Sequence, residues 1–327
     1  MRVLVVTNMW PTERSPALGP FVRDQVNALR EIEGLDVEVY SFDPPGGIAP
    51  YLKAAVDVAR RYRGRRFDVV HAHYGLSGAC ALGARGARRR VVTFHGDDLR
   101  LRKVAGISQV VARLVDLPAT VSGDLARSEA ARLGGPGTRR RVAVLPCGVD
   151  LNRFRPMARE EARKRLGLDP SGPYLLFPAD PARPEKRHDR AGALAEAAGA
   201  QLLTYSNTEP ELVPAYINAA NAVIVTSERE GFGLAPLEGL ACDVPVLATP
   251  VGIAPLALSG IAGALCEEFE VERWLAALEP HLTAADPRVA GRARASIFGS
   301  DRMAERVACA YRELAGDNGR QPPVAGV

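Results

Sequence analysis

Short apolar runs alternate along the chain with longer amphipathic segments. In the first half these runs predict strands, because each is short and is bounded by polar or turn-forming residues. The predicted strands cover residues 3–6, 37–40, 68–71, 91–94, 119–122 and 142–145. After the first, Phe21, Val22, Val26 and Leu29 recur at helical spacing and predict a helix over residues 21–31. Alternating strands and helices are typical of a doubly wound parallel sheet.

The second half repeats this alternation after a charged helical stretch that ends at Gly167. Its predicted strands cover residues 174–177, 202–205, 222–226, 244–248 and 261–265. Near the end, Met303, Val307, Ala308 and Tyr311 fall at helical spacing and predict a helix. We therefore expect an α/β protein with two doubly wound, Rossmann-like domains. The expected parts are a domain of residues 1–155, a domain of residues 156–300, a helix at 301–315 and a flexible tail at 316–327.

Size and composition agree with that organisation. A chain of 327 residues is long enough for two domains, and 47% hydrophobic and 24% charged residues are typical of a globular protein. No apolar run reaches the roughly 18 residues of a membrane span, and the amino terminus reads as a first strand rather than a signal peptide. The 5 cysteines form no CxxC pair, which favours a reducing compartment without disulfides or metal sites. We expect a cytoplasmic protein.

Positive charge is concentrated in the first half. The net charge is +4 overall, but residues 1–155 carry about +10 and the remainder about −6. Arginine clusters lie at residues 60–66, 85–90 and 139–141. They are either a solvated surface or a contact with an anionic membrane or an acidic acceptor. A nucleic-acid partner is not expected, because the clusters lack interleaved aromatic residues and a recognition motif.

The stretch at residues 230–250 concentrates chemistry-bearing residues between two predicted strands. Gly231 and Gly233 allow backbone angles and close ligand approach that a side chain would block. Pro236 is tolerated only in a first helical turn, so a helix should begin near residue 234 or 235. Glu230 and Glu238 then lie on either side of a helix N-terminus. Ordinary helix capping explains the spacing alone, but the glycines, the proline and both carboxylates together favour a nucleotide site.

The same stretch resembles the E-x7-E signature of the retaining glycosyltransferases of family 4, at Glu230 and Glu238. The resemblance extends over most of the chain and implies the GT-B fold, with the donor held mainly by the second domain. It implies that Glu230 lies near the donor sugar and that Glu238 binds the nucleotide ribose. The other residues expected to bind the donor are Gly19, Gly231, Phe232, Gly233 and Leu234.

The resemblance also implies a basic loop and a glycine loop around the donor diphosphate. At residues 179–190, Lys186 matches the family lysine, whereas the family arginine falls on Pro181, so Arg183 is the expected substitute. Such cations would clamp a diphosphate, although a solvated helix start is the alternative. Gly19 follows the first strand in place of a GxGxxG motif, which disfavours a dinucleotide site.

Histidines follow two predicted strands of the first domain. His95 lies in a segment that resembles the family's strand-end histidine motif, which faces the reacting sugar. His73 is a second candidate cleft residue, and His71 and His73 would make a metal pair only with a third ligand. Ser122 could contact a ligand or simply cap a helix. The expected catalytic set is His95, Glu230, Lys186 and Arg183, without a metal or cofactor.

Three positions depart from the family pattern. Cys147 stands at a usual asparagine, Asp243 at a usual glycine, and Val251-Gly252 at a usual Gly-Gly pair. Strings at residues 71–78, 181–191 and 212–227 look most like enzymes of teichuronic acid or other cell-surface glycan synthesis. The expected activity is sugar transfer from a nucleotide-sugar, most simply a UDP-sugar, to a glycan or lipid-linked acceptor. Alternatives are a nucleotide-sugar epimerase on the same fold and a two-lobed small-molecule binding protein.

Overall fold

The computed structural model describes residues 1–43, 46–134 and 142–316 of the chain. The arginine cluster at residues 139–141 and the tail from residue 317 onward lie outside this part. The chain divides into two compact units. Unit 1 comprises Met1–Met9, Gln25–Leu145 and Met303–Val327, and unit 2 comprises Trp10–Asp24 and Pro146–Arg302. The division therefore falls after Leu145, and the loop that follows the first strand is counted with the second unit.

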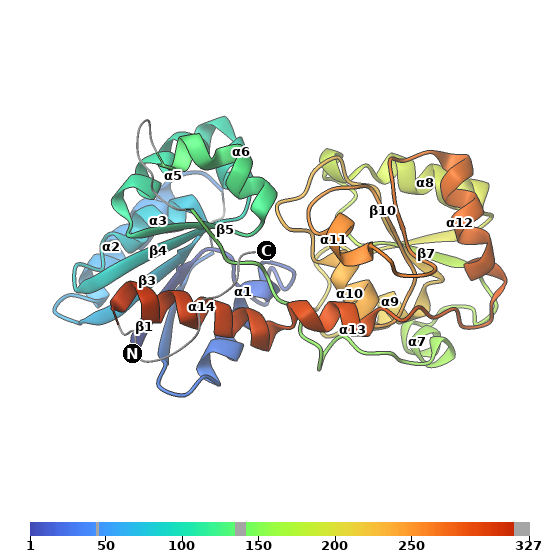
Figure 1. Cartoon of the computed structure of the whole chain (residues 1–327), viewed down its shortest axis with the longest axis horizontal. Coiled ribbons are helices and arrows are strands. Elements are labelled where there is room, and N and C mark those ends of the chain that lie inside the picture. Colours follow the sequence, from blue (N-terminus) through green and yellow to red (C-terminus); the bar gives the residue numbers. More distant parts are fainter. Residues whose placement is uncertain (44–45, 135–141, 317–327) are drawn as a thin grey trace. The chain divides into compact units, whose positions relative to one another are not determined.

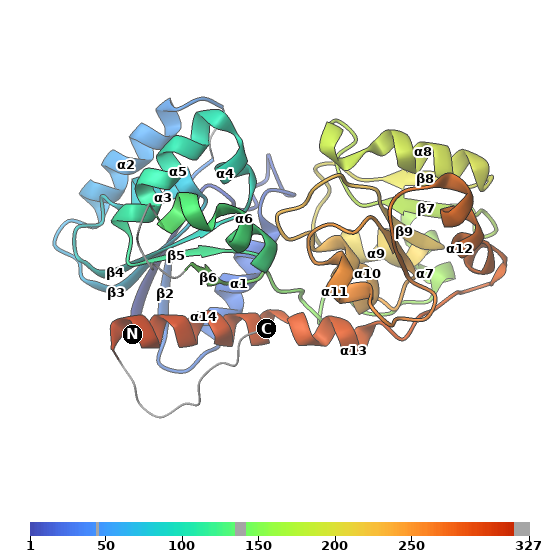
Figure 2. The same cartoon turned by 45° about the horizontal axis from the view of Figure 1, so that its top comes forward.

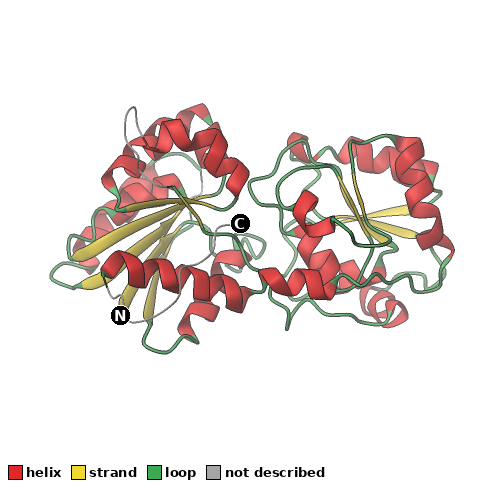
Figure 3. Ribbon diagram, viewed as in Figure 1, coloured by secondary structure: helices red, strands yellow, loops and turns green. Residues whose placement is uncertain are grey.

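Unit 1 is built on a parallel sheet with helices against it (Figures 1 and 3). Its strands are β1 (Arg2–Thr7), β2 (Asp36–Ser41), β3 (Phe67–His73), β4 (Ala87–Phe94), β5 (Leu117–Thr120) and β6 (Ala143–Val144). Its helices are α1 (Pro20–Arg30, begun in unit 2), α2 (Ala49–Arg61), α3 (Gly75–Ala81), α4 (Asp97–Arg100), α5 (Arg102–Leu114), α6 (Gly123–Gly134) and α14 (Ser300–Ala315).

Unit 2 repeats the same plan on a second parallel sheet. Its strands are β7 (Tyr174–Phe177), β8 (Gln201–Thr204), β9 (Ala222–Val225), β10 (Val246–Ala248) and β11 (Leu265–Cys266). Its helices are α7 (Arg159–Leu166), η1 (Pro184–Lys186), α8 (His188–Ala197), α9 (Val213–Ala219), α10 (Ala235–Ala241), α11 (Ala254–Leu258), α12 (Val271–Thr283), α13 (Arg292–Ala295) and η2 (Ser296–Phe298).

The strand order is the same in both units. In unit 1 it is β2-β1-β3-β4-β5-β6, and in unit 2 it is β8-β7-β9-β10-β11. In each sheet the first strand of the unit lies between the second and the third. The chain therefore reverses its direction of winding there, at β1/β3 and at β7/β9. In open α/β sheets, ligands bind at the carboxyl ends of the strands beside such a reversal.

The expected doubly wound α/β architecture is confirmed in both units, with small corrections at the element level. The predicted strand at residues 261–265 is wrong: Leu265–Cys266 forms β11, whereas the preceding residues form turns that contain the positive-φ Gly260 and Gly263. β1 is almost wholly buried, as a central parallel strand covered on both faces should be. No helix in the described ranges combines the length and apolar character needed to cross a membrane.

Candidate functional site

Lys186 and Glu230 meet across the point of reversal in the second sheet. Lys186 ends the loop after β7 and Glu230 lies in the loop after β9. The Lys186 Nζ lies 2.6 Å from Oε1 and 2.7 Å from Oε2 of Glu230. The Ser227 hydroxyl donates a further hydrogen bond of 2.8 Å to Glu230 Oε1. The structure therefore brings together a cation and a carboxylate that the sequence suggested separately.

Hydrogen bonds to backbone groups also join these two loops. The Thr226 hydroxyl contacts the carbonyls of Lys186 and Arg187 at 3.0 and 2.9 Å, and the Glu228 amide donates to the Glu185 carbonyl at 2.9 Å. These bonds tie the loop after β9 to the loop after β7 independently of the ion pair. The two loops that carry Lys186 and Glu230 are thus joined by these bonds as well as by the ion pair.

Glycine is required at two positions around Glu230. Gly233 adopts a φ of +79°, and Gly252 adopts a φ of +58°. A Cβ on Gly252 would collide with the Phe232 carbonyl, which accepts a 2.7 Å hydrogen bond from the Ile253 amide. Gly231, by contrast, does not take a positive φ. Of the two glycines in the motif, Gly233 has the backbone requirement.

Helix α10 places the second carboxylate of the motif. Leu234 precedes the helix without a side-chain cap, Pro236 lies in its first turn as expected, and Glu238 follows in that turn. Burial raises the pKa of the Glu238 carboxyl to about 7; the Arg153 charge opposes this shift and the Asp24 charge adds to it. Glu238 is therefore a carboxyl group that titrates near neutral pH.

A buried ion pair lies in the electrostatic neighbourhood of Glu238. Arg153 donates to both carboxylate oxygens of Asp24, at 3.0 and 2.6 Å, and both side chains are largely buried. Both terminal nitrogens of the Arg153 guanidinium therefore donate to Asp24. Neither Asp24 nor Arg153 was identified as a site residue from the sequence, because nothing in their local sequence signals a pairing over 129 positions.

The remaining predicted donor-side residues have other partners. Arg183 pairs with Glu185 at 2.6 Å. The neighbouring Arg187, in the same basic loop, bonds Asp189 and Glu228, each at 2.6 Å. Gly19 directly precedes α1 with a φ of +65°, and its carbonyl accepts from the Val22 amide at 3.0 Å. These contacts place Gly19 in the turn that starts the helix and leave its ligand role a prediction.

In unit 1, histidines gather at the carboxyl ends of β3 and β4. His73 Nδ1 lies 3.2 Å from His95 Nε2, and the rings of His71 and His73 lie 4.5 Å apart. His71 contacts the Tyr311 hydroxyl at 2.6 Å and the Thr93 hydroxyl at 2.8 Å. The ring nitrogens of His73 and His95 therefore contact each other, whereas those of His71 contact Tyr311 and Thr93.

Burial keeps these histidines neutral. It lowers the pKa of His95 to about 4 and that of His71 to about 3, in the latter case with a smaller contribution from His95. It also lowers the pKa of His73 well below the usual value. A neutral imidazole carries one ring proton, so the cluster offers hydrogen bonds rather than positive charge at neutral pH.

The acid that shapes the loop around His95 is Asp98. It is fully buried, and its carboxylate accepts from the His95 and Gly96 amides at 3.0 and 2.9 Å and from the Gly75 amide at 3.0 Å. Burial raises the pKa of Asp98 to about 6, although these hydrogen bonds lower it. The neighbouring Asp97, by contrast, is exposed. Ser122 caps α6 through Leu125 at 3.3 Å, which matches the capping alternative.

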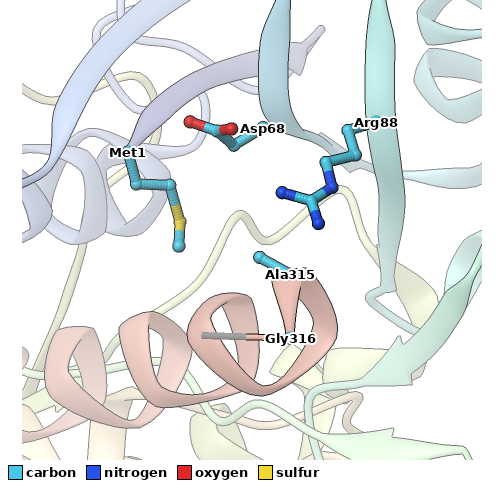
Figure 4. Close-up of a pocket in the computed structure, with 5 residues that line it drawn as sticks. All are labelled: Met1, Asp68, Arg88, Ala315 and Gly316. Atoms are coloured by element: carbon cyan, nitrogen blue, oxygen red, sulfur yellow. The ribbon is translucent and has the colours of Figure 1, made fainter. Parts of the chain in front are cut away.

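A hollow of about 310 Å³ opens elsewhere in unit 1, between Met1, Asp68, Arg88, Ala315 and Gly316. Figure 4 shows the Asp68 carboxylate and the Arg88 guanidinium on its walls. It lies where β1, β3 and β4 begin, whereas the histidines lie where β3 and β4 end. By the rule for open α/β sheets, the hollow is at the wrong edge for a substrate site.

The fold of the chain is similar to that of solved structures of known proteins. The fold resembles sucrose-phosphate synthase from Thermosynechococcus elongatus, with a TM-score of 0.72 at 17% identity over 97% of this chain and 99% of that one. It also resembles HepE of Anabaena in complex with UDP-glucose, with a TM-score of 0.64 at 16% identity over 95% and 99%. The chain therefore has the GT-B fold.

Sequence comparison identifies the family. Residues 2–153 match the model described as Glycosyltransferase Family 4, and residues 182–291 match Glycosyl transferases group 1. The D-inositol 3-phosphate glycosyltransferase of Geodermatophilus obscurus is 30% identical over 93% of this chain and 76% of that protein. The enzyme of the same name from Thermobispora bispora is 31% identical over 83% and 76%. The chain belongs to glycosyltransferase family 4.

Two of the departures from the family pattern have local explanations. Asp243 takes a φ of +55°, which aspartate tolerates better than most residues, and its carboxylate accepts from the Gly291 and Arg292 amides at 3.0 and 2.8 Å. Asp243 thus caps the start of α13. Cys147 is buried, and this burial raises its thiol pKa to about 12, which makes it a packed side chain rather than a nucleophile.

Proposed function

We propose that the protein transfers a sugar from a UDP-sugar, with retention at the anomeric carbon, to a glycan or lipid-linked acceptor in cell-surface polysaccharide synthesis. The observation that carries the proposal is the pairing of Lys186 with Glu230 at the point of reversal in the sheet of unit 2, with Glu238 on the following helix. A position at the carboxyl ends of the strands suits a nucleotide ligand. The UDP-glucose in the HepE complex supports the choice of donor.

Each residue of this group has a role that its contacts support. An ammonium has three N–H groups, and Glu230 occupies two of them, so the third can contact a leaving diphosphate. A cation fixed there would stabilise negative charge as it develops. Glu230 would also accept from the donor sugar hydroxyls, and Glu238 would bind the ribose. Arg183 is a second, more exposed cation for the diphosphate.

The two carboxylates do not form an acid and base pair in this proposal. Glu230 is held as the counter-ion of Lys186, so it is not poised to protonate a leaving group. We assign it a binding role and assign no role to a metal ion or another cofactor. His95 and His73 would line the acceptor side and offer neutral hydrogen-bonding groups to sugar hydroxyls.

The chemistry at the strand ends of unit 1 supports the proposed acceptor. The D-inositol 3-phosphate glycosyltransferases among the relatives carry a phosphorylated acceptor in their name, which makes such an acceptor the second candidate. In the three residues that follow each strand of unit 1, however, the sequence has no Lys or Arg that would pair with a phosphate. This favours a hydroxyl-rich acceptor. We place the enzyme in the cytoplasm, in peripheral contact with the membrane.

A thermal-shift screen followed by an activity assay tests the proposal. UDP-, GDP-, ADP- and dTDP-glucose would be compared first, and we expect UDP-glucose or another UDP-sugar to give the largest shift. Turnover would then be measured with lipid-linked saccharides and with D-inositol 3-phosphate. Faster turnover of inositol phosphate would replace the proposed acceptor with the second candidate. Release of an epimerised UDP-sugar without any acceptor would overturn the transferase mechanism.

A further inference from the structure

Large apolar side chains are exposed on two helices of unit 1. On α2 and the turn before it, Ile48, Leu52 and Val56 are 56%, 62% and 50% exposed. On α5, Val110 and Leu114 are 52% and 58% exposed. A soluble monomer exposes single apolar residues everywhere, but aligned rows of them mark an interaction site.

The spacing puts each group on one stripe of its helix. Residues 48, 52 and 56 are separated by four positions each, and residues 110 and 114 by four, so each set lies along one face. The opposite faces are the packed ones, since Ala54 and Val58 of α2 and Ser108, Val111 and Ala112 of α5 are buried. The apolar stripes therefore point away from the sheet.

Helix α3 links the two helices that carry the stripes. It packs closely on both α2 and α5, and a Cβ on Gly75 of α3 would collide with Ser108 of α5. Figures 1 and 2 both place α2, α3 and α5 together on one side of the sheet. The solvent-facing side of α2 and α5 is defined here as the α2/α5 surface.

The charge around the α2/α5 surface is predominantly positive. On the stripe of α2, Arg60 follows Val56 by four positions, and Lys53 lies beside Leu52. On α5, Lys103 starts the stripe that continues to Val110 and Leu114. Exposed basic residues on or next to these helices are Lys53, Arg60, Arg61, Arg63, Arg66, Arg100, Arg102, Lys103 and Arg113. In residues 46–66 and 99–115 the sequence has a single acidic residue, Asp57, which accepts from the Tyr40 hydroxyl at 2.8 Å.

We propose that the α2/α5 surface is a membrane-docking surface that lies on an anionic bilayer, with its apolar stripes in the acyl boundary and its basic residues at the headgroups. Amphipathic helices with this combination bind in the interface plane. A second copy of the chain fits less well, because a symmetric contact would place the basic residues of both copies together. This inference rests on the proposed function in that it supplies the residues for the peripheral membrane contact.

Vesicle sedimentation of the full chain tests the surface without any activity assay. Vesicles of phosphatidylcholine alone would be compared with vesicles containing phosphatidylglycerol, at low and at physiological salt. We expect binding to the anionic vesicles, weakened by salt, and loss of at least tenfold in binding for L52S/V56S/V110S/L114S. The control L256S/I297S changes two residues of unit 2 that are each 49% exposed and should bind like the wild type.

Three results would overturn the proposal. The wild type could stay in the supernatant with anionic vesicles at low salt, or the fourfold serine variant could bind as the wild type does. Light scattering could also show a dimer that the serine variant converts to a monomer, which would assign the surface to a second copy. Circular dichroism melting confirms that the variant is folded. Nucleotide-sugar binding is measured separately, so the proposed donor site and the docking surface can fail independently.

Discussion

Lys186 and Glu230 form a bidentate ion pair, with the Lys186 Nζ 2.6 Å from one carboxylate oxygen of Glu230 and 2.7 Å from the other. Both side chains are only 13% and 12% exposed. The sequence suggested that the lysine serves the diphosphate and the glutamate serves the sugar. The ion pair couples these two roles, because a displacement of either side chain would change the position of its partner.

The first prediction concerns the lysine. Lys186→Ala should lower kcat by about 100- to 1,000-fold, the range found when a preorganised donor to a developing anion is removed. Donor affinity, measured by titration with a UDP-sugar, should fall less. Lys164→Ala, an exposed lysine on α7 of the same unit, is the matched control and should leave both quantities unchanged. Equal activity of the two variants would remove Lys186 from the site.

The second prediction concerns the pH dependence of donor binding. The Glu238 pKa is raised to about 7, so the carboxylate that accepts from ribose hydroxyls becomes fully populated only above that pH. Donor affinity should therefore rise between pH 6 and pH 8. Glu238→Gln keeps the shape but cannot ionise, and it should bind the donor weakly with no such rise. Isothermal titration at several pH values measures this, and an unchanged pH profile in the variant would contradict it.

The same shift has a consequence for stability. Because the folded-state pKa of Glu238 lies above the usual glutamate value, the folded protein binds more protons between those two pKa values. This contribution to stability is fully present below about pH 4.5 and is lost as the pH rises through about 7. In Glu238→Gln the corresponding fall in melting temperature with rising pH should be smaller than in the wild type.

The third prediction distinguishes a catalytic contribution of His73 from a structural contribution of Tyr311. His73→Phe removes the contact with His95 Nε2 and keeps a ring beside His71, so kcat should fall by roughly tenfold, the loss of about one hydrogen bond. Tyr311→Phe removes only the hydroxyl that contacts His71 and should cost about 1 kcal/mol of stability with kcat unchanged. Steady-state kinetics and urea unfolding distinguish the two. Equal kinetic losses would mean that the cluster acts only as packing.

The fourth prediction concerns the loop beside Glu230. Gly252→Ala places a Cβ against the Phe232 carbonyl in a left-handed backbone, which costs about 1–2 kcal/mol before any loop movement. Donor affinity should fall by tenfold or more. Gly192→Ala on α8 is the control, since a Cβ there meets open space, and it should be neutral or slightly stabilising. Unchanged donor affinity in Gly252→Ala would show that the loop tolerates displacement.

Local patterns were enough to predict the two doubly wound units, because strand length, helical period and turn residues are local properties. They also placed Glu238 in a first helical turn, because Pro236 restricts where α10 can begin. The pairing of Lys186 with Glu230 was not predictable, since it joins loops 44 positions apart. The same holds for Asp98, which the sequence could not distinguish from Asp97 without the three amides that surround it.

Helix α7 shows a different limit. Its sequence is strongly charged and reads as a solvent-facing helix, yet Arg159 and Arg163 are each 4% exposed. Arg163 donates to the Ala219 carbonyl at 3.1 Å and to Asn221 at 3.0 Å, at the end of α9. Arg159 donates to the Ala285 carbonyl at 2.9 Å. Arginine can be buried where carbonyls at a helix end need donors, and a hydrophobic pattern does not record such partners.

Helix α14 completes the interior of unit 1, although its residues from Met303 onward follow all of unit 2 in the sequence. Its residues Met303, Val307 and Tyr311 are interior residues of unit 1, where Tyr311 contacts His71 of β3. A ribosome must therefore translate all of unit 2 before the interior of the first unit can close. Until then, the nascent amino-terminal half exposes the apolar surface that α14 will cover, which makes it a substrate for chaperones while the later half folds.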